Sequence, residues 1–337
     1  WTVCASGCTY SKVEDAWNAA DKLTFLNGTT LSINIADGTY HIPDVLETIN
    51  PEMANVYIYG NYASPQNVVL EIDNPTTGNL VDIPGIYINN GGRLGLLSGV
   101  TLTRPNNGLY DLSSGDFSTS SSAVWKNWAT AIIQRSSTTL VLDKVSMVGF
   151  YNGILCAWDS TTTANNVTIN NYGGVGIMTR RSSSISANGI TVTNGSSSSN
   201  CSSGITSDSA ASMVITNLTV NKSCYGVFSP QGAYAELGGV TLTNLTNGVI
   251  ATAGGFASLS NATISNTKFA LTATNRGMVD GDRVTITNVT TPIFADTLGY
   301  VILSNTLSGM PDSGSSIIHG DGSANGYSWK GGSAQVN

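Results

Sequence analysis

The sequence predicts an all-β chain that winds into a right-handed, single-stranded parallel β-helix, a solenoid whose coils stack on one another. Two observations predict it: a composition that cannot coat amphipathic helices, and a repeat of 22 residues built from short β-branched segments. Only 10% of the 337 residues are charged, 41% are hydrophobic, and glycine contributes 37. Soluble domains usually carry about 25% charged residues. We therefore expect a surface made mainly of Ser, Thr, Asn and Gly.

Two columns of the sequence show the repeat independently. In the first, a short strand begins at equivalent positions separated by 23, 28, 22, 22, 22 and 22 residues. These positions are Gly153, Gly176, Gly204, Gly226, Gly248, Ala270 and Pro292. In the second, apolar–polar–apolar triplets begin at residues 145, 167, 190, 218, 240, 262 and 284. The long interval appears in both columns, so residues 194–203 are interpreted as a loop inserted into one repeat.

Each repeat holds about three short strands separated by turns, which is typical of one coil of a parallel β-helix. A strand of three residues is not stable alone, so neighbouring repeats must stack and pair at the inter-strand distance of about 4.8 Å. Right-handed winding is expected from the general bias of parallel crossovers. A leucine-rich horseshoe is rejected because its leucine pattern is absent.

The extent of the repeat divides the chain into three regions. Residues 1–30 are expected to form an N-terminal cap with a helix over 11–23, where Ser11 and Glu14 make a capping box. Residues 31–307 form the β-helix, with regular coils over 145–307 and an excursion over 103–140. Residues 308–337 form an irregular cap or tail. The helix would cover the open end of the solenoid.

One outward column does not suit solvent. It comprises Leu155, Met178, Thr206, Phe228, Ile250, Thr272 and Phe294. An apolar stripe of this length is normally covered. Either a loop such as 103–140 lies over it, or it is the interface between three copies of the chain; we favour the homotrimer.

The most distinctive group of charged residues follows the glycine-led strand on three successive repeats. It comprises Trp158, Asp159, Arg180, Arg181 and Asp208. One interpretation is a sugar site: Trp158 is an apolar platform, the arginines hold an acidic sugar, and the two aspartates act as acid and base. Glycoside hydrolysis uses two carboxyl groups about 5–9.5 Å apart, which stacked coils can supply. The plainer interpretation is a surface ion pair with a stacked tryptophan, worth about 0–1 kcal/mol.

The excursion supplies a second group of candidate sugar-binding residues: Tyr110, Trp125 and Trp128. Aromatic side chains on a polar loop suit carbohydrate, although the tryptophans could equally pin the loop to the coils. Glu236 and Asp280 share an outward column and are interpreted as surface solvation. His41 and His319 stand apart from each other and from any acid. No Ser-His-Asp triad, metal site or cofactor is therefore expected.

Five cysteines point to an oxidising, extracellular setting. A bridge between Cys201 and Cys224 is geometrically possible because they fall near one column on neighbouring coils. A Cys4–Cys8 bridge is also possible, and the odd count leaves Cys156 as a buried thiol. The net charge of −7 argues against nucleic acid as a partner. No apolar run approaches the length of a membrane span.

The opening segments SKVEDAWNAA, TLSINIADGTYHIPD, NVYIYGN and NVVLEI resemble the start of bacteriophage tail-spike and tail-fibre β-helices. Related openings occur across the pectate-lyase-like superfamily, where a turn like Ala36-Asp-Gly-Thr-Tyr40 follows the first strand. The resemblance implies a homotrimer in the virion tail, attached to other tail or baseplate proteins, that binds and often cuts bacterial surface polysaccharide. The catalytic motifs of pectate lyases, polygalacturonases and pectin esterases are absent.

Three functions remain open from the sequence. The first is a tail-fibre receptor-binding protein that recognises surface glycan without chemistry. The second is an endo-acting polysaccharide depolymerase, a hydrolase or a lyase. The third is a secreted bacterial adhesin of the same architecture.

Overall fold

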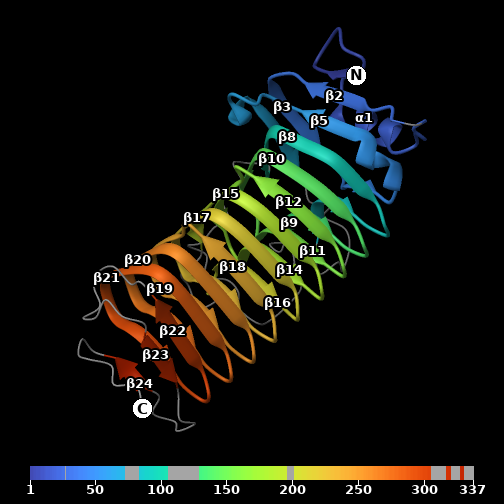
Figure 1. The fold of residues 1–337 in the computed structure, drawn as a ribbon. Coiled ribbons are helices and arrows are strands. Elements are labelled where there is room, and N and C mark those ends of the chain that lie inside the picture. Colours follow the sequence, from blue (N-terminus) through green and yellow to red (C-terminus); the bar gives the residue numbers. More distant parts are fainter. Residues whose placement is uncertain are drawn as a thin grey trace, which may run out of the picture. The chain divides into compact units, whose positions relative to one another are not determined.

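The computed structural model describes residues 1–26, 28–72, 83–104, 129–195, 201–304, 316–319 and 327–329. The chain forms two compact units, Trp1–Gly174 and Val175–Asn337. Each unit is a stack of parallel coils, visible in Figure 1 as layered strands. Tyr110, Trp125 and Trp128 lie outside the described residues.

The second unit contains the most regular coils. Its strands are β14 (Val175–Arg180), β15 (Ser184–Gly195), β16 (Ser203–Asp208), β17 (Ser212–Ser229), β18 (Tyr234–Gly238), β19 (Thr241–Ala251), β20 (Phe256–Ala273), β21 (Met278–Ala295) and β22 (Tyr300–Ser304). The residues that follow the column of glycines are register partners from coil to coil: Ile177, Ile205, Val227, Val249, Leu271 and Ile293. The predicted stacking is therefore confirmed within this unit.

The first unit winds in the same way with less regular coils. Its strands are β1 (Thr2–Val3), β2 (Leu31–Ile35), β3 (Gly38–Ile42), β4 (Leu46–Thr48), β5 (Val56–Tyr59), β6 (Val68–Ile72), β7 (Ile83–Ile88), β8 (Arg93–Thr103), β9 (Ala129–Gln134), β10 (Thr139–Val148), β11 (Asn152–Ala157), β12 (Thr161–Asn165) and β13 (Thr168–Tyr172). Strand β10 pairs in parallel with both β8 and β12. Strands β9 and β10 thus begin inside the segment expected to be an excursion, and regular winding starts before residue 145.

Helix α1 (Val13–Ala20) is shorter than the expected 11–23, and 3-10 turns η1 (Pro51–Asn55) and η2 (Pro65–Asn67) follow it in the chain. The expected capping box does not form, because Lys12 is the N-cap residue and makes no side-chain cap. The helix buries Val13, Ala16, Trp17 and Ala20. Trp17 Nε1 donates a hydrogen bond of 2.7 Å to the carbonyl of Glu47, which joins the helix to strand β4.

The last coil of the second unit pairs with two short antiparallel strands. Strand β23 (Ser316–His319) pairs with β22, and β24 (Tyr327–Trp329) pairs with β21. They lie in the 308–337 segment that was expected to be irregular. Antiparallel pairing satisfies edge groups that would otherwise template further strands. In the part of the chain that the structure describes, no helix is long and apolar enough to cross a membrane.

The interior of the second unit combines branched residues with a column of small ones. Thr179, Ser207, Ser229, Ala251, Ala273 and Ala295 point inward and are at most 1% exposed. The hydroxyl groups among them are satisfied: Ser207 and Ser229 each donate to backbone carbonyls, and Thr179 donates to Ser207 at 3.2 Å. Buried polar groups therefore cost little here.

The outward apolar stripe is partly covered within the single chain. Leu155, Thr206 and Thr272 are buried. The half-buried members are Met178, Phe228, Ile250 and Phe294. In the second unit the ring of Tyr225 stacks on Phe228 at 5.7 Å, and Phe269 meets Phe294 at 6.1 Å. Neighbouring aromatic rings thus cover part of the apolar stripe, which the sequence analysis expected a loop or other subunits to cover.

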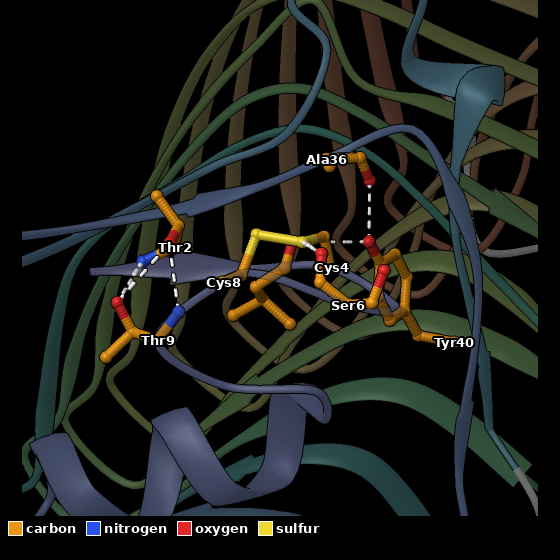
Figure 2. The surroundings of a disulfide bond; sticks show 8 residues. Thr2, Cys4, Ser6, Cys8, Thr9, Ala36 and Tyr40 are labelled. Atoms are coloured by element: carbon orange, nitrogen blue, oxygen red, sulfur yellow. Dashed lines mark hydrogen bonds between the residues drawn. A yellow bond between two sulfur atoms is a disulfide. The ribbon is translucent and has the colours of Figure 1, made fainter.

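Two disulfides are present. Cys201 and Cys224 join neighbouring coils of the second unit, and Cys4 and Cys8 close a tight loop before helix α1. Figure 2 shows that loop, where Tyr40 donates a hydrogen bond to the carbonyl of Ala36. Cys156 is buried and takes no part in either disulfide.

The abundance of asparagine has a backbone cause. In one turn of each coil a single residue adopts left-handed geometry, with φ between 52° and 58°. In the second unit this residue is Asn194, Lys222, Asn244, Asn266 or Asn288. Asparagine tolerates this region better than most residues because its short amide can bond locally. The side chains also bond along the stack, for example from Asn288 Nδ2 to Asn266 Oδ1.

Lys222 is the exception in that column, so Lys222→Asn is expected to raise the free energy of unfolding by about 0.5–1 kcal/mol. Urea denaturation of the two proteins measures the change. Lys268→Asn is the matched control, because Lys268 lies in strand β20 without left-handed geometry. An equal gain in both variants would contradict the backbone explanation.

Candidate functional site

A row of two-residue turns runs along one edge of the second unit and is called the turn edge below. Both residues of each turn are left-handed, with φ between 49° and 78°. The turns are Arg181–Ser182, Ser209–Ala210, Gln231–Gly232, Ala253–Gly254, Asn275–Arg276 and Thr297–Leu298. Backbone hydrogen bonds link successive turns, such as Ala210 N to the carbonyl of Gln231 at 3.2 Å. The edge therefore presents side chains at the regular coil spacing of about 4.8 Å.

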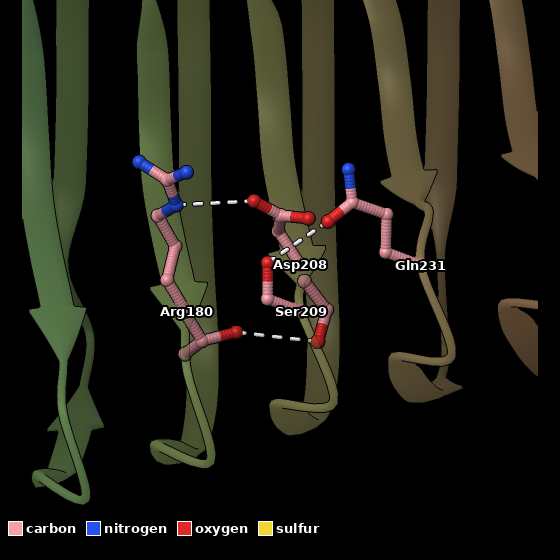
Figure 3. A network of polar contacts seen from close by, with 6 residues as sticks. Arg180, Asp208, Ser209 and Gln231 are labelled. Atoms are coloured by element: carbon pink, nitrogen blue, oxygen red, sulfur yellow. Dashed lines mark hydrogen bonds and ion pairs between the residues drawn. The ribbon is translucent and has the colours of Figure 1, made fainter. Parts of the chain in front are cut away.

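The structure brings Arg180 and Asp208 together on this edge. They are register partners at the ends of β14 and β16, and Arg180 Nε donates to Asp208 Oδ2 at 3.0 Å (Figure 3). At the next residue, Ser209 Oγ donates a hydrogen bond of 3.1 Å to Gln231 Oε1. This bond extends the row of polar side chains to the following coil. Two adjacent residues of the edge are thus linked to neighbouring coils by side-chain hydrogen bonds.

Asp208 lies in a nearly closed environment on the turn edge. The residue is only 9% exposed and its partner is a guanidinium. Its second oxygen, Oδ1, is buried and has no hydrogen-bond partner among the described residues. Because Nε of Arg180 is engaged, the outer nitrogens of that guanidinium are the groups that can meet a ligand. The pair is therefore suited to presenting hydrogen-bond donors to a ligand.

The other members of the predicted cluster are divided between the two units. Arg181 is an exposed residue of the turn edge. Trp158 and Asp159 belong to the first unit, where both are left-handed and Asp159 is exposed. The guanidinium of Arg135 lies 4.8 Å from the centre of the Trp158 ring, so one face of this expected sugar platform is already occupied. The combined five-residue site remains a prediction.

Two further expectations can be compared with the structure. His41 is not isolated from acids, because its Nε2 lies 3.1 Å from Glu71 Oε2 in the adjacent strand; that expectation was wrong. The second expectation concerns Glu236, which was interpreted as surface solvation. It accepts a hydrogen bond of 2.9 Å from Tyr234. This bond, together with burial, raises the pKa of the tyrosine. The same ring stacks on Phe256 at 5.3 Å, so its face is engaged within the protein.

A groove on the turn edge was not foreseen from the sequence. It has a volume of 490 Å³ and is lined by Ala253, Gly254, Asn275, Arg276, Thr297 and Leu298. These residues recur at the 22-residue period after Gln231 and Gly232, so the period could have aligned them. Nothing in that alignment indicates that the last three turns leave a hollow.

Comparison with solved structures identifies the fold. An alginate lyase from Paenibacillus sp. str. FPU-7 is 13% identical over 86% of this chain and 97% of its own, with a TM-score of 0.57. Pectin methylesterase PemA from Erwinia chrysanthemi is 14% identical over 85% of this chain and 88% of its own, with a TM-score of 0.46. The catalytic domain of a GH87 α-1,3-glucanase, solved with nigerose, is 12% identical over 86% of this chain and 64% of its own, with a TM-score of 0.39. At these identities the likeness to the alginate lyase shows a common fold. No protein-family model matches the chain, and no curated protein matches its sequence.

Proposed function

We propose that this chain binds an extended bacterial surface polysaccharide along the turn edge of its second unit, as the receptor-binding part of a phage tail fibre or spike. The Arg180–Asp208 pair, extended by Ser209 and Gln231, carries the proposal. It sets charged and neutral hydrogen-bonding groups on successive coils of a straight edge. The phage setting is supported by the sequence resemblance of the first coils. The partly covered outward stripe supports a homotrimer as the assembled form.

A polysaccharide fits this edge because both are linear and repetitive. A polymer lying along the stack meets a new coil about every 4.8 Å, so one weak contact can be repeated along the chain. Sugars offer hydroxyl groups that exchange water for partners such as the Ser209 hydroxyl and the Gln231 amide.

Cleavage of the bound polymer is the second candidate function. It is favoured by one feature of the edge, the carboxylate of Asp208 beside a guanidinium, because a carboxylate can take a proton from a sugar hydroxyl, a water molecule or a carbon acid. Hydrolysis also needs a second carboxyl group; the sequence predicted Asp159, which belongs to the first unit. A lyase would instead remove a proton beside an acidic group held by arginine.

The test is a glycan-array and strain-binding screen with the purified protein. Arg180→Gln and Asp208→Asn are each expected to weaken binding about tenfold or more, because a charge-assisted hydrogen bond to the ligand or its support is lost. Arg283→Gln is the matched control, since it breaks another 3.0 Å arginine–aspartate pair, with Asp282, on a different turn. It should change binding by less than about twofold.

The outcomes separate the candidates. Absence of binding to every glycan, or equal losses in the control and the two edge variants, would overturn the proposal. New reducing or unsaturated ends after incubation with a bound polysaccharide would establish cleavage. Asp208→Asn should then abolish those ends, while an unchanged rate would remove Asp208 from the chemistry.

A further inference from the structure

We propose that the groove at the last three turns of the turn edge is a subsite for an acidic group of the bound polymer, a carboxylate or a sulfate. The inference rests on the proposed polysaccharide binding and adds the charge of the ligand. The groove is defined by the pairs Ala253–Gly254, Asn275–Arg276 and Thr297–Leu298.

Arg276 supplies the charge of this groove. It is the one charged residue among the six described residues that line it. In the part of the chain covered by the structure, no ion pair or side-chain hydrogen bond involves its guanidinium, whereas Arg180 and Arg283 are each held by an aspartate. A planar guanidinium binds carboxylate or sulfate oxygens with two parallel hydrogen bonds. An exposed arginine of this kind is ready to bind an anion without first losing a partner.

The backbone indicates that arginine is not there for structural reasons. Arg276 has a φ of 65°, in the left-handed region. At the same position of the other five turns the chain carries Ser182, Ala210, Gly232, Gly254 and Leu298, so the turn geometry does not select arginine. We therefore attribute its presence to its charge.

The rest of the groove suits a sugar ring. Leu298 is 43% exposed and, with Ala253, offers apolar surface for the hydrophobic face of a ring. Asn275 adds an amide with donors and an acceptor. Gly254 keeps the groove open, because nothing lies within 4 Å of the place where a side chain would start.

The groove is also rigid before a ligand arrives. Gly254 N donates to the carbonyl of Asn275 at 3.1 Å, and Arg276 N donates to the carbonyl of Thr297 at 3.1 Å. These bonds hold the three turns in register, so little conformational entropy remains to be lost on binding. Asp296, which directly precedes the groove residue Thr297, accepts a hydrogen bond of 2.7 Å from Thr297 N and forms no ion pair with Arg276 in the described residues.

The net negative charge of the whole chain opposes the binding of an acidic polymer, so such binding requires local positive charge. A protein with a net charge of −7 repels polyanions at long range. Binding of an acidic polymer at about 0.15 M salt, where the screening length is about 8 Å, must therefore come from local cations. Arg276, together with Arg180 and Arg181, places three of them on one edge.

The test measures binding of three probes by calorimetry: oligogalacturonate as a carboxylate polymer, dextran sulfate as a sulfate polymer, and neutral dextran. The intact protein is expected to bind at least one acidic probe and not the neutral one, and the tighter acidic probe identifies the anion. Arg276→Gln should weaken that binding about tenfold or more. Lys222→Gln, the same charge change on another turn, should alter it less than about twofold.

A second variant separates charge from structure. Arg276→Gly removes the charge and relieves the left-handed strain, so it should raise the thermal unfolding midpoint and still lose binding of the acidic probe. A purely structural arginine would give the opposite pattern, with lower stability. Undiminished acidic binding in both Arg276 variants, or binding of neutral dextran alone, would overturn the groove inference.

The two proposals fail in different ways. If Arg180→Gln weakens binding of a glycan from the array and Arg276→Gln does not, the groove inference is wrong and polysaccharide binding on the turn edge stands. If only neutral glycans bind, the acidic subsite is likewise excluded. If no glycan binds the intact protein, both proposals are overturned.

Discussion

Substitution of Gly277 by alanine is expected to lower the free energy of unfolding of the second unit by about 3 kcal/mol or more. A Cβ atom built on Gly277 would lie 2.1 Å from the carbonyl oxygen of Ala251 and 2.7 Å from the nitrogen of Thr252. These are backbone atoms of the preceding coil, so no rotamer change relieves the clash. The two coils must separate locally, and the hydrogen bonds between them weaken. Guanidinium denaturation followed by circular dichroism measures the loss.

Gly238→Ala is the control for this prediction. Gly238 ends strand β18, and the nearest atom to its built Cβ is the hydroxyl oxygen of Ser260 at 3.3 Å. Ser260 can rotate its side chain, and alanine restricts the unfolded chain more than glycine does. The change in stability should therefore be below about 1 kcal/mol in either direction. Equal losses in Gly277→Ala and Gly238→Ala would show that close stacking of the coils at Gly277 is not what requires glycine.

The period of the sequence was sufficient to predict which residues become neighbours across coils. Ile205, Val227 and Val249 share a column in the sequence and are register partners in the structure. The contact between Arg180 and Asp208 follows from the same alignment. The two residues are 28 positions apart, which is one repeat including its inserted loop, so they fall on adjacent coils. Stacking is thus encoded by spacing alone, without reference to side-chain chemistry.

Features that break the period could not be predicted in this way. His41 and Glu71 are 30 residues apart in the irregular first coils, so no column aligns them. The helix begins after Lys12 rather than after Ser11, so the local capping pattern did not determine where it starts. The groove is lined by turns in which Asn275 and Thr297 are left-handed; asparagine tolerates this geometry, whereas β-branched threonine rarely adopts it. Turn geometry of that kind is set by the stacked neighbours and not by local sequence preference.

Removal of the Cys201–Cys224 disulfide is expected to destabilise the second unit by about 3 kcal/mol, the loop-closure entropy for a loop of this size. The two cysteines are 23 residues apart and join adjacent coils. Cys201 stands just before β16, at whose far end Asp208 contacts Arg180. The double variant Cys201→Ser with Cys224→Ser should therefore increase hydrogen exchange in β16 and β17, and should weaken glycan binding at the turn edge.

The second disulfide provides the comparison that separates this effect from a general loss of stability. Cys4 and Cys8 are only 4 residues apart and lie in the first unit. Replacing both by serine opens only a short covalent loop. Hydrogen exchange in β16 and β17 should therefore stay unchanged, while exchange in the segment before helix α1 increases. Local opening at one place in a structure need not reach another, so a disulfide before helix α1 should not protect β16 and β17. If both double variants increase exchange in β16 equally, the units unfold together, and the role assigned to Cys201–Cys224 in holding the turn edge is wrong.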